Sequence, residues 1–424
     1  MGAILAHTTM SPAYAEEYLL SAGMWSSKHK AAVEAAGGTI LYAHDKSGIA
    51  VAKSDNANFL TTLKGSRGVA FQSAEPDMVV SWSQPTRFME ADVEVDVTPE
   101  DEPGFAFQWN MQAIDAPAAW AAGCDGTGAR VAVIDGGIYA EHPDIAPNLD
   151  VTCSRSFVDG QPFNTDVGFF WHGTHVAGIV AAADNRVGVI GVAPGATLMH
   201  VKALHDGRGS FGAIIMGILY AADPASFGGG CTQPADIINL SLGATFPKSQ
   251  AGGFHSLINK AVNYAGSKGV LVISAAGNDG LDFSKVADLI ATPAQAGSGL
   301  AISATGPVGG DNYRRPASYS NYGSSLVTLA APGGDFTMYP AAGWHLDMVL
   351  SPCSPLSAYC WSAGTSQAAP AAAGVAALIK AANPGISLGA LKAKLMQTAD
   401  DEGKVGNDEF YGKGFVNAYR ACTE

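Results

Sequence analysis

From about residue 105 onward, short apolar runs alternate with helix-like stretches. The runs are apolar almost throughout and end in small or polar residues: "ARVAVIDGG", "ATLMHVKAL", "ADIINLSLG", "GVLVISAAGN" and "GLAISATG". Segments such as "HGTHVAGIVAAA" and "FGAIIMGILYAA" lie between them and are typical of buried helices. Because strands that are apolar on both faces need cover on both sides, this pattern predicts a parallel sheet flanked by helices, an α/β fold. In such sheets, functional residues gather at the carboxyl ends of the strands.

The first part of the chain has a different pattern. Residues 16–85 suggest a strand, a helix, two strands around an "HDKSG" turn, a second helix and a last strand. This β-α-β-β-α-β order predicts a small α+β unit of the split-βαβ, ferredoxin-like type. Residues 1–15 contain an A-x-A pattern at Ala13–Ala15, so this tail is either a signal-peptide remnant or a chance match.

An acidic stretch separates the two patterns. Seven carboxylates and no basic residue occur between residues 90 and 102: Glu90, Asp92, Glu94, Asp96, Glu100, Asp101 and Glu102. Since like charges repel, we expect an extended and exposed linker over residues 86–104 that contains a protease-sensitive maturation site. Residues 105–424 then form the α/β domain.

The charge balance excludes two classes of partner. The chain has 424 residues and a net charge of −14, whereas nucleic acids and anionic membranes attract basic surfaces. No apolar run approaches the roughly 20 residues that span a bilayer. We therefore expect neither a nucleic-acid partner nor a membrane partner.

The cysteines indicate an oxidising compartment. There are six of them and none forms a C-x-x-C pair, which argues against a zinc ribbon or a thioredoxin-type site. An even number suits disulfides. Cys353 and Cys360 flank a short loop and are expected to pair, and the other four cysteines allow three pairings that the sequence does not separate.

Four residues whose side chains could take part in catalysis lie at the ends of predicted strands and helices. Asp135 ends "VAVID", His172 opens "HGTHVAG", Asn278 ends "VLVISAAGN" and Ser366 opens the last long helix. A serine hydroxyl needs an adjacent base, which His172 supplies, while Asp135 orients the imidazole. The Ser366 N–H and the Asn278 amide can donate to a developing oxyanion. Each residue alone has a simple structural interpretation as a helix cap, a turn residue or a strand end, but all four in this order favour a nucleophilic enzyme.

The motifs around these residues extend the argument. "VAVIDGGI…HPDI", "HGTHVAGIVAA", "VIGVAP", "NLSLGA", "SAAGND" and "GTSQAAPAAAGVAAL" together closely resemble the subtilisin-like (subtilase) serine proteases over roughly residues 100–420. The resemblance implies a subtilisin-like, seven-stranded parallel sheet and peptide-bond hydrolysis through an acyl-enzyme on Ser366. It also implies that the N-terminal unit is an inhibitory propeptide and intramolecular chaperone. We therefore expect a secreted, monomeric serine endopeptidase that processes itself from a zymogen and acts on proteins or peptides.

The same resemblance implies which residues contact the substrate. Ser241, Leu242 and Gly243 resemble the strand that pairs with the substrate backbone. The expected pocket residues are Phe211, Ile214 and Leu242 for the S4 walls, Leu204 for S2 and Ala291 for the base of S1. Because the S1 base is small and uncharged, we expect a preference for large apolar or aromatic P1 residues. The alternative is that these side chains only fill the core.

A structural Ca²⁺ is a further implication of the resemblance. "AADNRVGVIG" matches the length of the family's calcium loop, and calcium prefers oxygen ligands. The implied ligands are the carbonyls of Ala183, Val187 and Val189, the amide oxygen of Asn185, and the carboxylates of Asp144 and of Asp101 or Glu102. The alternative is a solvated turn.

One departure from the family pattern keeps a second function class open. Gly136 follows Asp135, where the family usually has Ser or Thr, so one hydrogen bond to the carboxylate is expected to be missing. If Gly136 misplaced Asp135, the chain would be a non-catalytic binding protein. A third class, an α/β-hydrolase esterase, needs G-x-S-x-G, and "GTSQA" lacks the second glycine.

Overall fold

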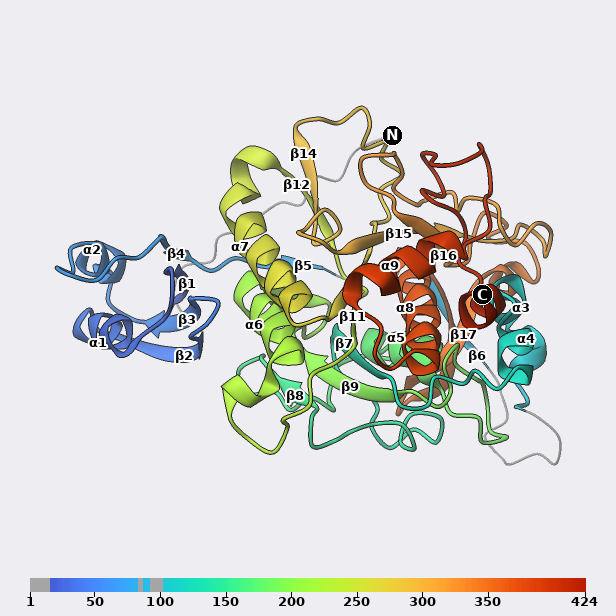
Figure 1. The fold of residues 1–424 in the computed structure, drawn as a ribbon, viewed down its shortest axis with the longest axis horizontal. Coiled ribbons are helices and arrows are strands. Elements are labelled where there is room, and N and C mark those ends of the chain that lie inside the picture. Colours follow the sequence, from blue (N-terminus) through green and yellow to red (C-terminus); the bar gives the residue numbers. More distant parts are fainter. Residues whose placement is uncertain (1–15, 83–86, 92–101) are drawn as a thin grey trace.

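The structure is a computed structural model that describes residues 16–82, 87–91 and 102–424. A small α+β unit lies beside a larger α/β body (Figure 1). The sheet of the larger body has seven strands in the order β16-β15-β13-β11-β7-β9-β8, and all of its strand pairs are parallel. This confirms the predicted fold class. The strands are β7 Arg130–Asp135, β8 Arg155–Ser156, β9 Thr197–Lys202, β11 Ile237–Leu240, β13 Leu271–Ala275, β15 Leu300–Thr305 and β16 Leu329–Pro332.

Helices cover both faces of this sheet. Val131 and Val133 of β7 pack in one apolar cluster with α5 (His172–Ala181) and α8 (Thr365–Ala382). Ala132 and Ile134 pack in a second cluster with α6 (Phe211–Ala222) and α7 (Lys248–Ser267). Burial on both sides explains why the strand is apolar at successive positions. The helices of the body are α3 Trp109–Ala113, α4 Ala116–Ala121, α5 His172–Ala181, α6 Phe211–Ala222, α7 Lys248–Ser267, α8 Thr365–Ala382, α9 Leu388–Gln397 and α10 Ala418–Thr423. Within the described ranges, none of the helices has the length and apolar character needed to cross a bilayer.

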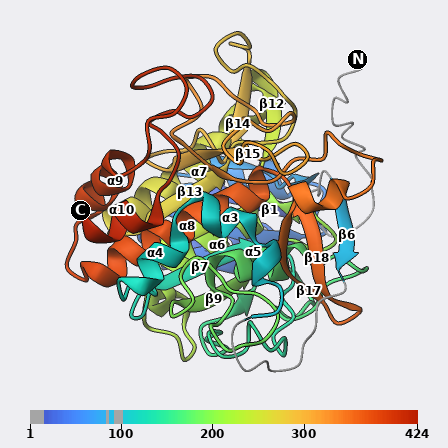
Figure 2. The ribbon, with the colours of Figure 1, turned by 90° about the vertical axis from the view of Figure 1, so that its right-hand side faces the viewer.

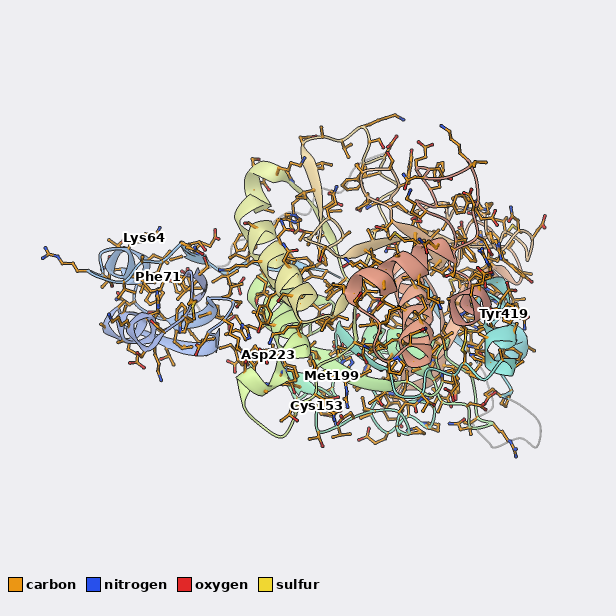
Figure 3. The ribbon with its side chains drawn as sticks, viewed as in Figure 1. Lys64, Phe71, Cys153, Met199, Asp223 and Tyr419 are labelled. Atoms are coloured by element: carbon orange, nitrogen blue, oxygen red, sulfur yellow. A yellow bond between two sulfur atoms is a disulfide. The ribbon has the colours of Figure 1, made fainter. Side chains whose placement is uncertain are left out.

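Three disulfides cross-link the body. The expected Cys353–Cys360 pair is present, and the structure selects one of the three open pairings for the rest: Cys124–Cys422 and Cys153–Cys231. Cys153 lies on the side of the body near the N-terminal unit, whereas Tyr419 on α10 lies at the opposite end (Figure 3). Cys124–Cys422 and Cys153–Cys231 join residues that are 298 and 78 positions apart, whereas Cys353–Cys360 closes a loop of seven positions.

The N-terminal unit has the predicted element order. Its elements are β1 Glu16–Ser21, α1 Ser27–Ala35, β2 Gly38–His44, β3 Ile49–Ser54, α2 Phe59–Lys64 and β4 Ser73–Pro76, with the antiparallel sheet order β2-β3-β1-β4. One sheet face packs on the unit's own helices, while Leu19, Ile49 and Val51 join the apolar cluster that contains α6 and α7. Lys46 forms an ion pair with Asp223 at 2.9 Å, and Asp223 lies on the side of the body that faces the unit (Figure 3).

Two short strands follow the unit and bind to different parts of the body. β5 Val79–Ser81 pairs antiparallel with β10 Arg208–Ser210. β6 Arg87–Ala91 pairs antiparallel with β18 Ser357–Ala363, which also pairs with β17 Val349–Ser354 (Figure 2). The region expected to be a free linker therefore begins as a paired strand.

The acidic stretch also departs from the expectation of full exposure. Glu102 is only 3% exposed, because its Oε1 accepts the backbone N–H groups of Asn185 and Arg186 at 3.0 and 2.9 Å. Hydrogen bonds to a carboxylate offset the cost of burying it. The expectation of an exposed side chain was wrong at this residue, and residues 92–101, including Asp101, lie outside the described part of the chain.

Candidate active site

Asp135 and His172 form a buried pair at the carboxyl end of β7, an interior strand of the main sheet. Asp135 is the last residue of β7, and His172 is the first residue of α5. His172 Nδ1 lies 2.8 Å from Asp135 Oδ1 and 3.0 Å from Oδ2. The Gly136 N–H also donates to Oδ1, at 2.7 Å. Since the carboxylate accepts from Nδ1, it fixes the orientation of the imidazole ring and leaves Nε2 for the other side.

Ser366 is the second residue of α8, where the helix leaves backbone N–H groups without intrahelical partners. Its Oγ donates to the Ser241 carbonyl at 3.1 Å, and Ser241 Oγ donates to the Ser366 carbonyl at 2.7 Å. His172 Nε2 is buried and accepts no hydrogen bond from the described residues. The site thus contains a serine hydroxyl that is fixed by a hydrogen bond to Ser241, and an imidazole nitrogen, His172 Nε2, that is able to accept a proton.

The Asn278 amide is fixed beside the start of α8. Its Oδ1 accepts both the N–H and the hydroxyl of Thr365, each at 2.8 Å. This orients Nδ2 toward the backbone before the serine, because a Cβ placed on Gly364 would lie 3.4 Å from Nδ2. The sequence interpretation missed Thr365, although its hydroxyl directly precedes Ser366. The arrangement provides two N–H donors, from Asn278 and from the start of α8.

A second missed residue, Asp166, explains Gly136. A Cβ on Gly136 would lie 2.3 Å from Asp166 Oδ2, and the same oxygen accepts the Gly137 N–H at 2.7 Å. A fully buried Lys202 lies 4.0 Å from the other carboxylate oxygen, and burial lowers the pKa of this lysine. Asp135 keeps its contact with His172 although Gly136 follows it. The alternative of a non-catalytic binding protein required Gly136 to misplace Asp135, and this structure therefore gives it no support.

The expected S4 and S2 residues form one buried aromatic and aliphatic cluster. It contains Leu204, Phe211, Ile214 and Leu242, together with Trp82 from the end of the N-terminal segment and Phe246, which the sequence interpretation missed. The Trp82 ring lies 4.7 Å from Phe211 and 6.1 Å from Phe246 between centroids, and its side chain is 3% exposed. Trp82 therefore packs within the cluster of residues expected to form S4 and S2.

The backbone of the same segment lies against the strand expected to bind substrate. The Trp82 carbonyl accepts the Gly243 N–H at 2.9 Å, and the Trp82 N–H donates to the Gly207 carbonyl at 2.9 Å. Ala291, expected at the base of S1, is buried outside the Trp82 cluster, in β14 Leu289–Thr292. β14 pairs with β12 Ala244–Pro247, which follows Gly243 directly.

The expected calcium ligands gather partly around Asp144. Its Oδ2 accepts the Val189 N–H at 3.1 Å and the Tyr359 hydroxyl at 2.9 Å. Its Oδ1 is buried and has no hydrogen-bond partner among the described residues, and burial raises the pKa of this carboxyl to about 7. A buried carboxylate oxygen of this kind suits a cation.

The rest of the calcium loop fits less completely. Asn185 Oδ1 accepts the Val187 N–H at 2.9 Å, so a metal would share this oxygen. In the described ranges, no group of three or more His, Cys, Asp or Glu side chains is arranged to hold a metal. Backbone carbonyls such as those of Ala183 and Val189 would therefore have to complete the site, as the sequence implied.

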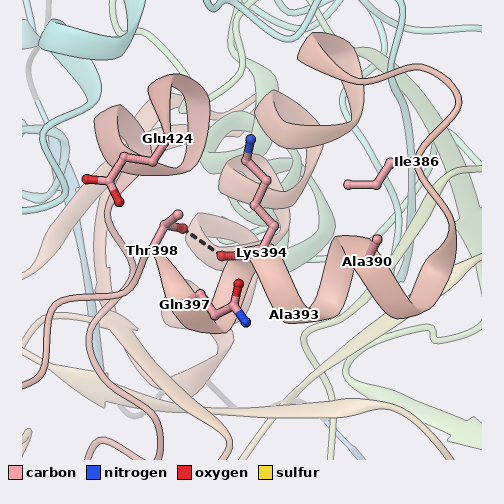
Figure 4. Close-up of a pocket in the computed structure, with 7 residues that line it drawn as sticks. All are labelled: Ile386, Ala390, Ala393, Lys394, Gln397, Thr398 and Glu424. Atoms are coloured by element: carbon pink, nitrogen blue, oxygen red, sulfur yellow. Dashed lines mark hydrogen bonds between the residues drawn. The ribbon is translucent and has the colours of Figure 1, made fainter.

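A separate surface pocket of about 480 Å³ lies along α9 (Figure 4). None of the candidate catalytic residues lines it, and it is therefore not the site described above. The lining residues are Ile386, Ala390, Ala393, Lys394, Gln397, Thr398 and Glu424.

Comparison with known proteins decides the family. The subtilase family model matches residues 126–414 of the chain. The chain belongs to the subtilase family. Subtilisin BL of Lederbergia lenta is 37% identical over 315 residues, which cover 74% of this chain and 97% of that protein. M-protease of Shouchella clausii (strain KSM-K16) is 37% identical over 336 residues, covering 79% of this chain and 73% of the relative.

A solved structure supports the fold over nearly the whole chain. The epidermin leader peptide processing serine protease of Staphylococcus aureus matches with a TM-score of 0.76 at 20% identity, covering 97% of this subtilase and 98% of that chain. At this identity the likeness shows the fold alone. The family match and the curated relatives show that this subtilase is a subtilisin-type serine endopeptidase.

Proposed function

We propose that Ser366 is the nucleophile of this subtilase, with His172 as general base and Asp135 as the residue that orients it. The observation that carries the assignment is the buried Asp135–His172 contact of 2.8 Å, at the carboxyl end of a parallel strand, where such sites form. Asn278 Nδ2 and the Ser366 N–H are the oxyanion donors. These four residues supply every group that acyl transfer requires.

The reaction follows from this geometry. Ser366 Oγ turns from the Ser241 carbonyl and attacks the carbonyl carbon of the substrate while His172 Nε2 takes its proton. The oxyanion accepts from Asn278 and from the start of α8, and His172 then protonates the leaving amine as the C–N bond breaks. A water molecule, deprotonated by His172, attacks the acyl-enzyme and releases Ser366.

The N-terminal unit is the enzyme's own propeptide, acting as inhibitor and chaperone. Support comes from Trp82, which fills the aromatic pocket and accepts from Gly243, and from Arg87, which pairs with Ala363, three residues before Ser366. Residues 83–86 join these two points. The bond cut during maturation is therefore proposed to lie within residues 83–86, at or just before the first residue of the linker expected over residues 86–104.

Three finer properties belong to the same proposal. The small Ala291 at the base of S1 favours large apolar or aromatic P1 residues, and three disulfides suit a secreted enzyme. A structural Ca²⁺ would be held by Asp144, Asn185 and Glu102 with carbonyls of the 183–189 loop. When bound, it would neutralise the buried Asp144 carboxylate and tie two loops together.

The test compares wild type with Ser366→Ala, produced in a host without proteases that cut this chain. Wild type should acquire a new N-terminus within residues 84–87, whereas Ser366→Ala should keep the full chain and lose kcat by about 10⁴ or more. Ser303→Ala is the matched control, because Ser303 is also buried but donates to Phe410, away from the site. Cleavage of Ser366→Ala at the same bond would show that processing is not its own reaction.

A further inference from the structure

The strand that leads to Ser366 binds a second backbone along its length. β18 pairs with β17 on one edge, and its other edge takes five residues of β6 in the register Arg87↔Ala363 to Ala91↔Tyr359. Ser362 Oγ also donates to the Arg87 carbonyl at 3.1 Å. Main-chain pairing of this kind accepts any extended peptide, and neighbouring side-chain pockets then provide the selectivity.

One of the side-chain contacts beside this strand is a cation–π contact. The Arg87 guanidinium carbon lies 3.6 Å from the centre of the Tyr339 ring and 5.8 Å from that of Phe336. Tyr339 packs edge-on against Trp344 with centroids 5.0 Å apart, and Phe336 stacks on Tyr319 at 5.4 Å. Packing of both rings against further aromatics fixes the faces that the guanidinium meets, as cation–π attraction requires.

The next residue of β6 meets a different aromatic ring. Phe88 stacks on Phe170 with centroids 5.1 Å apart and planes inclined by 20°. Phe170 in turn lies 6.0 Å from the His172 ring. The edge of β18 and the three rings that meet Arg87 and Phe88, namely Phe170, Phe336 and Tyr339, are here together named the primed-side strip.

We propose that the primed-side strip binds the part of a substrate that follows the cut bond, and that it selects arginine, or less strongly lysine, at the second residue of that part. This rests on the proposed function, in which β6 is the product segment of self-cleavage. Arginine is favoured because its planar guanidinium covers an aromatic face better than an ammonium does. An acidic residue at the same position would meet the negative faces of the rings.

The position follows from counting along the chain. If Trp82 in the S4 pocket is the fourth residue before the cut bond, that bond follows Pro85, and Arg87 is the second residue after it. Pro85 is apolar but smaller than the residues that the S1 pocket is expected to prefer. Peptide substrates for the test therefore carry Phe before the bond and Arg, Ala or Glu at the second position after it.

The first measurement is kcat/KM of the mature enzyme on internally quenched peptides that differ only at that second position. The Arg peptide should exceed the Ala peptide by roughly 3- to 30-fold, the range of cation–π contacts from exposed to desolvated, and the Glu peptide should be the poorest. Tyr339→Ala should remove the preference, whereas Tyr339→Phe, which keeps the ring face, should retain most of it. Tyr419→Ala is the matched control, since Tyr419 is 42% exposed against 47% for Tyr339 but lies on α10.

The second measurement isolates binding on this side. An ester substrate gives one common acyl-enzyme, and Ala-Arg-amide or Ala-Ala-amide then competes with water. The amine nitrogen attacks the acyl carbon, the bond to Ser366 Oγ breaks, and His172 carries the proton from the amine to Oγ. The Arg amide should give roughly 3- to 30-fold more peptide product than the Ala amide, and Tyr339→Ala should equalise them.

The outcomes separate the proposal from the proposed function. Both measurements are repeated in Arg87→Ala, because a retained β6 would compete for the strip. Equal rates for the Arg and Ala peptides in both backgrounds, or a preference that survives Tyr339→Ala, would overturn the inference. Hydrolysis of a Phe anilide, which has no residues after the bond, should be the same in wild type and Tyr419→Ala and absent in Ser366→Ala. Loss of this Ser366 dependence would overturn the catalytic assignment instead.

Discussion

The two sides of Ser366 hold the same chain in contrasting ways. Trp82 is 3% exposed and sits inside an aromatic cluster, whereas Phe88 is 43% exposed and Arg87 lies on Tyr339, a ring that is itself 47% exposed. The first contact draws its free energy from removing apolar area from water. The second depends on backbone pairing and on a cation at a surface ring. A propeptide can thus be anchored tightly on one side while the other side remains open to exchange.

The largest effect expected from this comparison concerns the proposed oxyanion donor Asn278, which acts on substrates that bind on either side of Ser366. Asn278→Leu should lower kcat by about 10²–10³ with little change in KM, because the amide acts on the oxyanion that forms only in the transition state. The loss should be equal for peptides optimised on either side. Steady-state kinetics on both peptide sets measure this, with Asn263→Leu on the exposed face of α7 as control. A change confined to KM would make Asn278 a ground-state contact.

The next largest effect concerns the buried side of the site, where Trp82 packs. A peptide with Trp at the fourth residue before the bond should exceed its Ala counterpart in kcat/KM by about 10- to 150-fold, the value of burying a large apolar side chain. Phe246→Ala should reduce this preference, because the Trp82 ring packs on Phe246. The same variant should leave the preference for Arg after the bond unchanged. If both preferences fell together, the two sides would not be independent.

The smallest effect is a shift in thermal stability. Chelation should lower the melting temperature by about 3–4 °C, since an ion that binds only the folded state at a hundred times its Kd contributes about 2.7 kcal/mol. Added Ca²⁺ should restore it, and Asp144→Asn should not respond to either treatment. Because Tyr359 of β18 donates to Asp144, chelation should also weaken the Arg preference more than the Trp preference. An unchanged chelator response in Asp144→Asn would place the ion elsewhere.

Much of the fold could be predicted because burial leaves a local trace in the sequence. β7 is apolar at successive positions since Val133 and Ile134 face different helical layers, and this pattern is visible without a structure. The candidate catalytic residues could be found for a related reason, because they stand where strands end and helices begin. Their roles stay predictions until the Ser366 and Asn278 variants are measured.

The residues that the sequence did not reveal act across long separations. Thr365 orients Asn278, Phe246 meets Trp82, and Tyr339 meets Arg87, and no pattern in the chain announces any of these contacts. At Glu102 the sequence pattern led to a wrong prediction, since the residue is buried and not exposed. A run of like charges predicts exposure, but the N–H groups that bury Glu102 belong to Asn185 and Arg186, far along the chain. A charge pattern indicates whether a segment is exposed when it is considered in isolation. Hydrogen bonds to groups from distant parts of the chain can bury the same residues.

The fit between Gly136 and Asp166 has a consequence for how the sequence can change over evolution. A Cβ at residue 136 would lie 2.3 Å from Asp166 Oδ2, and so the serine or threonine common in the family at residue 136 is excluded while that carboxylate stays in place. Removing Asp166 first would leave the Gly137 N–H without its 2.7 Å acceptor. Either order of single steps passes through a worse protein, so the two positions are epistatic. Proteins that carry glycine at residue 136 are expected to keep aspartate at residue 166, and a change at one of these positions should be accompanied by a change at the other.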